Sequence, residues 1–124
     1  MTQSSASDAM WTPPPRDECA EQRMPVALEE QYLLNVRRVT WNGQLVEYAV
    51  VLSFRESVDE AWVEIHSIDT KHHGCVHRHR DGDHTSWDEI RPIQSQADVQ
   101  SSFADSYDEV YSVYLILTGQ DPLK

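Results

Sequence analysis

Histidine is concentrated in one short segment of this 124-residue chain, since five of its six histidines lie between positions 72 and 84. An unperturbed imidazole titrates near neutral pH, so it can take up and release a proton under physiological conditions. In an extended strand, His77 and His79 project from one face with side chains roughly 6–7 Å apart, and His73 precedes them across a turn at Gly74. We expect His73, His77 and His79 to carry acid–base catalysis on a phosphodiester.

Cationic side chains beside these histidines are candidates for binding the phosphate, because the transition state of such a reaction needs positive charge around it. We expect Lys71, Arg78 and Arg80 to contact substrate, with Asp69 orienting a histidine. In an ideal strand the two arginines point to the face opposite the histidines. A bulge or the strand end would have to turn one of them, so Lys71 is the easier candidate.

The same spacing is also typical of metal ligands. A His-x-His pair on a strand can present two imidazoles to one zinc ion, with a third ligand from elsewhere. This alternative selects His77, His79 and His84 as ligands and zinc as the cofactor, whereas the acid–base hypothesis needs no cofactor. A third interpretation is a polar edge strand whose charges prevent edge-to-edge association.

The clearest structural signal is a β-hairpin over residues 31–54. Asn42-Gly43 is a favoured pair for a type I′ turn, in which both central residues need positive φ angles. With these two residues as the turn, Arg38 faces Glu47, an opposite-charge pair across the strands. Apolar residues then face apolar residues along the hairpin, as the correct register requires.

Two further strands and a helix complete the expected domain. Residues 61–68 and 76–80 alternate as strands do. Residues 95–118 carry an apolar stripe at helical spacing, formed by Val99, Phe103, Tyr107, Val110, Tyr114 and Leu117. These elements predict an α+β fold, in which a small antiparallel sheet in β-β-β-β-α order packs against one C-terminal helix.

In the N-terminal segment the sequence predicts no helix or strand of the domain. Three prolines follow Trp11, and they must be extended because proline fixes φ and lacks an N–H donor. We therefore expect residues 1–24 to form a flexible or strap-like tail and residues 25–120 to form a single domain.

The charge of the chain is strongly negative, with 21 acidic and 10 basic residues and a formal net charge of −11. Such an excess repels nucleic acid and anionic membrane as a whole and favours basic partners. Residues 69–91 are nearly neutral and become positive as their histidines protonate. Charges more than about 8 Å apart are largely screened, so a local cationic site is compatible with an acidic protein.

Two observations bear on location. The longest apolar run is far shorter than the roughly 20 residues that a membrane span needs, and the N-terminus lacks the pattern of a signal peptide. We expect a cytoplasmic protein with no membrane partner. Cys19 and Cys75 are then expected to be free thiols.

The segment from Asp69 to Arg80 resembles the TumE-like family of small bacterial toxin–antitoxin proteins. The resemblance rests on Asp69, on the His73-Gly74 step, on the closing His77-Arg78-His79-Arg80 and on the helical segment that follows. It implies a toxin-like role against RNA and an antitoxin-like protein partner.

These observations together predict a small toxin-like ribonuclease that cleaves RNA without a metal. The alternative from another class is a non-enzymatic acidic interaction module that holds a partner through its helix. A homodimer is compatible with either hypothesis.

Overall fold

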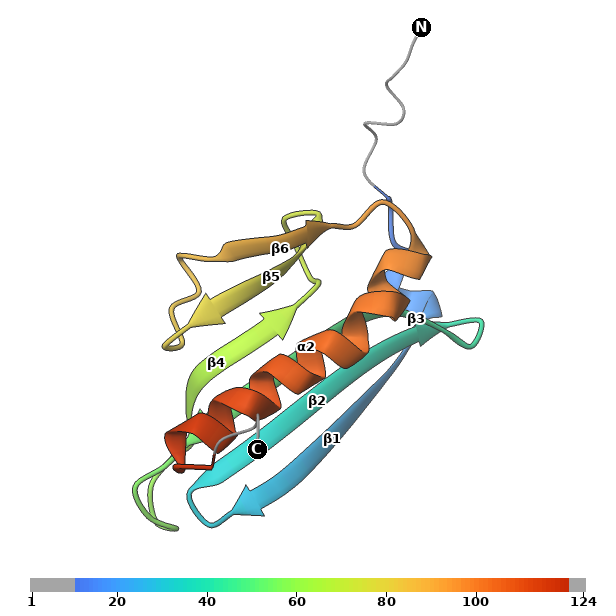
Figure 1. Cartoon of the computed structure of the whole chain (residues 1–124). Coiled ribbons are helices and arrows are strands. Elements are labelled where there is room, and N and C mark those ends of the chain that lie inside the picture. The colour runs from blue at the N-terminus through green and yellow to red at the C-terminus, as the bar shows by residue number, and fades with distance from the viewer. Residues whose placement is uncertain (1–10, 121–124) are drawn as a thin grey trace, which may run out of the picture.

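One antiparallel sheet and one long helix make up the fold in the computed structural model, which describes residues 11–120 (Figure 1). Six strands follow one another across the sheet in sequence order, and the helix lies over one face. The α+β class is confirmed, but the expected number of four strands is wrong. The elements are η1 (Arg16–Glu18), β1 (Ala20–Glu29), β2 (Tyr32–Trp41), β3 (Gln44–Phe54), β4 (Val63–Asp69), β5 (Cys75–Arg80), β6 (Asp88–Pro92) and α2 (Gln96–Leu117).

The β2–β3 hairpin has the expected turn but a different register. Asn42 and Gly43 have φ angles of 51° and 78°, as the two-residue turn requires. A bulge after the first two residue pairs then shifts the pairing by one residue, so that Arg38 faces Tyr48 and not Glu47. The expected pair of Arg38 with Glu47 is therefore wrong, because a bulge places two residues of one strand opposite one residue of the other.

The two edges of the sheet lie where the sequence predicted no strand. β1 crosses the predicted boundary between tail and domain and pairs with β2. Nearly all of its residues are exposed, and it carries Pro25 and several charges, which is typical of a protected edge strand. β6 is a five-residue strand that pairs with β5 at the other edge. Neither strand alternates between apolar and polar residues, because neither has a fully covered face.

The proline-containing segment after Trp11 lies against the sheet as a strap. Trp11 packs on the hydrophobic core and shares a hollow of about 250 Å³ with Trp41, Pro14 and Pro15. Arg16 then forms an ion pair of 3.1 Å with Glu47 of β3. The part of the predicted tail at residues 1–10 lies outside the described residues.

The helix α2 confirms the predicted helical segment to within one residue at each end. Its last turn, however, is more open than the predicted stripe required, because Leu117 is 53% exposed. The hydroxyl of Tyr48 on β3 lies 2.8 Å from those of Ser102 and Ser106, which gives these buried polar groups partners. The buried helix residues are Val99, Ser102, Ser106, Val110 and Tyr114.

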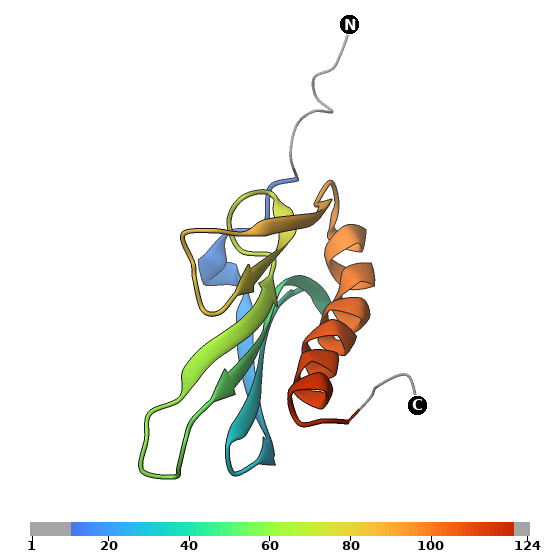
Figure 2. The ribbon, with the colours of Figure 1, turned by 60° about the vertical axis from the view of Figure 1, so that its left-hand side comes forward.

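The hydrophobic core fills the space between α2 and the middle of the sheet. Figure 2 shows α2 on one side of a curved sheet. The short η1 lies at one end of the other face, where Arg16 pairs with Glu47. The face away from α2 is the one on which a site can form. The buried apolar core residues include Leu34, Val36, Leu45, Tyr48, Val50, Leu52, Ile68, Val76, Ile93, Val99 and Val110.

Within residues 11–120, α2 and the short η1 lack the combination of length and apolar character that a membrane-crossing helix needs.

Candidate metal centre

The predicted histidine strand is β5, and the neighbouring strand β4 supplies a carboxylate. The two strands are antiparallel, with Asp69 directly opposite His77. Directly opposed residues project from the same face, and His79 shares this face because it lies two residues along β5. The face points away from α2, since the intervening Arg78 contacts Glu109 of the helix.

A hollow of about 320 Å³ lies over this face of the sheet. It brings together the three histidines that were predicted to be catalytic, and it adds Lys71 and Asp69 from the predicted substrate-binding set. The titratable residues that line it are Arg37, Glu64, Asp69, Lys71, His72, His73, His77, His79 and His84.

His77 is held from both sides of its ring. Its Nδ1 lies 3.0 Å from the carbonyl oxygen of Cys75. A carbonyl oxygen only accepts hydrogen bonds, so Nδ1 must carry the hydrogen and donate it. Nε2 lies 3.1 Å from Oδ1 of Asp69, and the residue is only 1% exposed. Both ring nitrogens of His77 are therefore engaged by the protein.

His79 repeats this arrangement one step along the strand. Its Nδ1 lies 3.2 Å from the carbonyl oxygen of Asp83 and 3.1 Å from that of Ser86, so Nδ1 again carries the hydrogen. Nε2 is turned toward Oδ2 of Asp69 at 3.7 Å. Because the two carbonyls fix the hydrogen on Nδ1, the Nε2 lone pair of neutral His79 is available to a cation.

Asp69 is the common partner of both rings. Its Oδ1 also accepts the backbone N–H of Lys71 at 2.9 Å. Burial raises the pKa of the Asp69 carboxyl, but the hydrogen bond and charge of His77 outweigh burial and lower it overall. Burial likewise lowers the pKa of His77, while the bonds to Asp69 and to the Cys75 carbonyl raise it overall. The pairing of a protonated His77 with an ionised Asp69 is therefore favoured.

These three side chains have the geometry of a metal-binding group. One ligand atom of each residue lies within 4.8 Å of those of the other two. In a tetrahedral zinc site with bonds of about 2.0–2.1 Å, the donor atoms are about 3.3 Å apart. The distances of 3.1 and 3.7 Å from Asp69 to the Nε2 atoms of His77 and His79 lie on either side of that value. The group could therefore hold a metal ion.

Two of the three predicted metal ligands, His77 and His79, belong to this group. The third member of the group is Asp69 in place of the predicted His84. His84 is exposed, and its Nε2 lies 2.8 Å from Oε2 of Glu64. The sequence does not reveal this exchange, because the position of Asp69 opposite His77 depends on how the loop between β4 and β5 is folded.

His73 lies at the rim of the hollow. Its ring stacks on Trp87, with centroids 4.2 Å apart and planes 16° apart, and it meets the His77 ring edge-on at 4.8 Å. Desolvation and the neighbouring His77 and His72 lower the pKa of His73. Sequence reasoning did not require Trp87 at the site, because its spacing from the histidines has no characteristic pattern.

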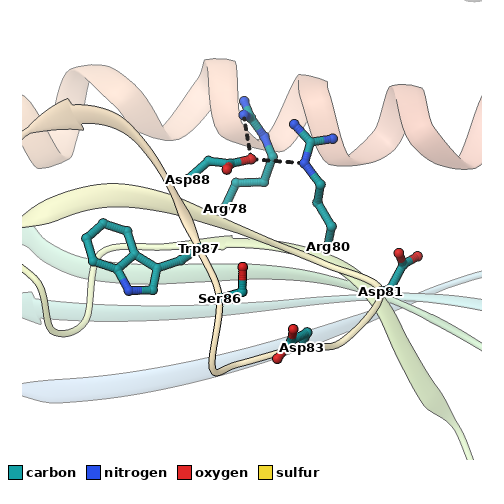
Figure 3. Close-up of a pocket in the computed structure, with 7 residues that line it drawn as sticks. All are labelled: Arg78, Arg80, Asp81, Asp83, Ser86, Trp87 and Asp88. Carbon is teal, nitrogen blue, oxygen red and sulfur yellow. Dashed lines mark hydrogen bonds and ion pairs between the residues drawn. The ribbon is translucent and has the colours of Figure 1, made fainter.

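The two arginines of β5 lie away from the hollow. Figure 3 shows both guanidinium groups directed toward the helix, with the carboxylate of Asp88 between them. Arg78 binds Glu109 through two hydrogen bonds of 2.6 Å each. The prediction that Arg78 or Arg80 reaches a phosphate beside His77 needs a bulge or the strand end to turn one of them. The pairing of β5 with β4 is regular, and Arg80 at the strand end pairs with Asp88.

Comparison of the chain with protein-family models, with curated proteins and with solved structures finds no match. Nothing in these comparisons bears on the resemblance to TumE-like toxins, which stays a prediction.

Proposed function

We propose that this protein binds a divalent transition-metal ion, with zinc as the expected ion, through Asp69, His77 and His79. The observation that carries the proposal is the direction of the two imidazoles. Each donates Nδ1–H to backbone carbonyl oxygens and turns Nε2 toward the same carboxylate. Metal-ligating histidines typically donate their second ring N–H in this way, which fixes the tautomer and the ring orientation.

The residues suggest a reactive centre more than a closed structural one. Structural zinc sites have four protein ligands, whereas catalytic sites have three and keep one position for water or substrate. Here three ligands lie beneath a hollow of about 320 Å³. An ion held there would lower the pKa of a bound water and polarise a substrate oxygen. The donor set of two histidines and one carboxylate also suits Fe²⁺, so the metal content decides between the two ions.

The test is metal binding by the full chain, measured by elemental analysis and by titration calorimetry. We expect one zinc ion per chain with a dissociation constant of about 1 µM or tighter, which corresponds to about −8 kcal/mol. At a free zinc concentration of 100 times the dissociation constant, the fold should gain about 2.7 kcal/mol.

Matched variants locate the ion. Asp69→Asn, His77→Ala and His79→Ala should each weaken zinc binding strongly, and Asp69→Asn preserves the shape of the side chain if a histidine variant fails to fold. His84→Ala is the control, because His84 lies in the same hollow but pairs with Glu64. A wild-type chain that binds neither zinc nor iron, or one whose binding survives Asp69→Asn, contradicts the proposal.

Toxin-like cleavage of RNA without a metal is a second candidate function. It is supported by Lys71, His72 and His73, which are exposed side chains of one loop and line the hollow beside the buried histidines. In this version His73 and Lys71 contact the phosphate, since both ring nitrogens of His77 are already engaged. Expression should slow bacterial growth, and His73→Ala should relieve it. Unaffected growth, or RNA cleavage that a chelator abolishes, contradicts this candidate.

A further inference from the structure

The loop between β4 and β5 is the most unusual backbone segment of the site. His72, His73 and Gly74 have φ angles of 70°, 64° and 65°. Glycine adopts this left-handed region readily, whereas residues with a side chain rarely do. Two consecutive histidines in this conformation place the ring of His73 over the hollow. Strained backbone of this kind persists only where surrounding contacts hold it.

Two hydrogen bonds hold the loop at its ends. The backbone N–H of Lys71 donates to the side-chain Oδ1 of Asp69, and the N–H of Ile93 donates to the carbonyl oxygen of Gly74 at 3.0 Å. Between these points the ring of His73 has a stacking contact with Trp87, and no hydrogen bond to either ring nitrogen is found among the described residues. The ends of the loop are therefore fixed by hydrogen bonds, while the ring between them is held by its contacts with the rings of Trp87 and His77.

His73 is also close enough to serve the ion. Its ring centroid is 4.8 Å from that of His77, while the His77 and His79 centroids are 5.0 Å apart. His84 is the other imidazole near the group, 4.4 Å from His79 between centroids, but its Nε2 is occupied by Glu64. Since His73 is not part of the compact ligand group, its ring must leave the stack to reach the ion.

We propose that His73 is an exchangeable fourth ligand of the metal and that Trp87 holds it off the ion. This inference rests on the proposed metal centre. In the stacked position, water or substrate occupies the fourth site. When the ring of neutral His73 rotates away from Trp87, one of its nitrogens donates its lone pair to the ion and the displaced water leaves to solvent. No bond in the chain is made or broken.

The proposal predicts opposite effects on zinc affinity for substitutions of His73 and of Trp87. His73→Ala removes a ligand and should weaken zinc binding by roughly tenfold or more. Mutation of residues that only hydrogen-bond to a metal ligand already lowers metal affinity by about 10–100-fold. Trp87→Leu removes the stack but keeps an apolar side chain, so it should strengthen zinc binding. His72→Ala is the matched control, because His72 also has a positive φ angle and lines the same hollow, and it should leave the affinity unchanged.

The experiment is zinc titration of these full-length variants, together with visible absorption of the cobalt-loaded protein. Water and an imidazole each complete a four-ligand site, so the exchange changes the type of the fourth ligand, and the position of the cobalt band should shift in opposite directions in Trp87→Leu and His73→Ala. Wild-type affinity and an unchanged cobalt spectrum in His73→Ala would overturn the inference. In that case the metal centre itself stands if Asp69→Asn still abolishes binding. A wild-type chain without metal affinity overturns both.

Discussion

The ring of His77 and the backbone carbonyl of Cys75 are joined by a hydrogen bond of 3.0 Å within a single strand. Residues two apart in a strand face the same side, so β5 itself supplies the acceptor that orients its own histidine. The ring's other nitrogen is thereby aimed across the sheet at Asp69. One short strand thus keeps a hydrogen on Nδ1 of His77 and determines the direction of its Nε2.

The first prediction concerns the metal-free fold. His77 is 1% exposed, and His77→Ala removes the main partner of the half-buried Asp69 carboxylate. We expect a loss of about 2–4 kcal/mol in the free energy of unfolding, measured by urea denaturation with chelator present. His72→Ala, at an exposed ring, should change the value by less than about 0.5 kcal/mol. Equal stability of His77→Ala and wild type would contradict the structural role given to the ring.

The part of the candidate site that follows from strand periodicity was predictable from the sequence. The period of two places His77 and His79 on one face and the arginines on the other, as the structure shows. Asp69 was expected to orient a histidine, but its place directly opposite His77 was not predictable, because it depends on the pairing of β4 with β5. That pairing follows a loop with left-handed residues at His72 and His73, which a side-chain pattern does not reveal.

In the fold, too, the elements that depend on local sequence were predictable, and those that depend on pairing between distant strands were not. The Asn42-Gly43 turn and the helix follow from local sequence signals and are confirmed. The bulge in the hairpin shifts the register by one residue, and nothing in the alternation of apolar residues marks it. β1 and β6 were missed because both are exposed edges, and an edge strand without a covered face has no apolar alternation to read.

The second prediction tests the polar contacts between helix and sheet. The hydroxyl of Tyr48 lies 2.8 Å from the hydroxyls of both Ser102 and Ser106, and all three residues are buried. Tyr48→Phe leaves two hydroxyls without that partner, so we expect a loss of about 1–3 kcal/mol in thermal or urea unfolding. Ser101→Ala, on the exposed side of α2, is the control. A loss in Tyr48→Phe no larger than in the control would show that the contacts add nothing to stability.

The third prediction concerns acid pH. Burial raises the pKa of Glu109, but hydrogen bonds from Arg78 and His66 outweigh it and lower the pKa overall. A carboxyl with a lowered folded pKa stabilises the fold above its unfolded pKa of about 4.3. That contribution is lost as the pH falls through the folded pKa. The side chain is 35% exposed, so solvent screening limits the contribution to about 1 kcal/mol.

The measurement is the unfolding free energy of Glu109→Gln and wild type at a series of pH values. The variant should be less stable at pH 7, and the difference should shrink as the pH falls below about 4. Asp105→Asn, an exposed position on the same helix, should show little difference at any pH. A deficit of Glu109→Gln that stays constant down to acid pH would mean that the lowered pKa of Glu109 is not what stabilises the fold.

The last prediction separates backbone strain from steric contact at two glycines. Gly43 and Gly82 have φ angles of 78° and 72°, so alanine costs roughly 1–2 kcal/mol at either position through the left-handed backbone alone. A Cβ at Gly43 meets nothing within 4 Å, whereas a Cβ at Gly82 lies 2.6 Å from the carbonyl oxygen of Glu64. Gly82→Ala must therefore displace the backbone of β4 or the turn after β5, and it should be clearly the less stable variant in urea.

The same pair of variants connects the turn to the metal centre. Gly82 precedes Asp83, whose carbonyl oxygen accepts the Nδ1 hydrogen of His79. A displaced turn would weaken that bond, and the Nε2 of His79 would lose its direction toward Asp69. Gly82→Ala should thus reduce zinc affinity under conditions where it remains folded, while Gly43→Ala, in the distant β2–β3 turn, should bind zinc as the wild type does. Equal zinc affinity in the two variants would show that the turn does not position His79.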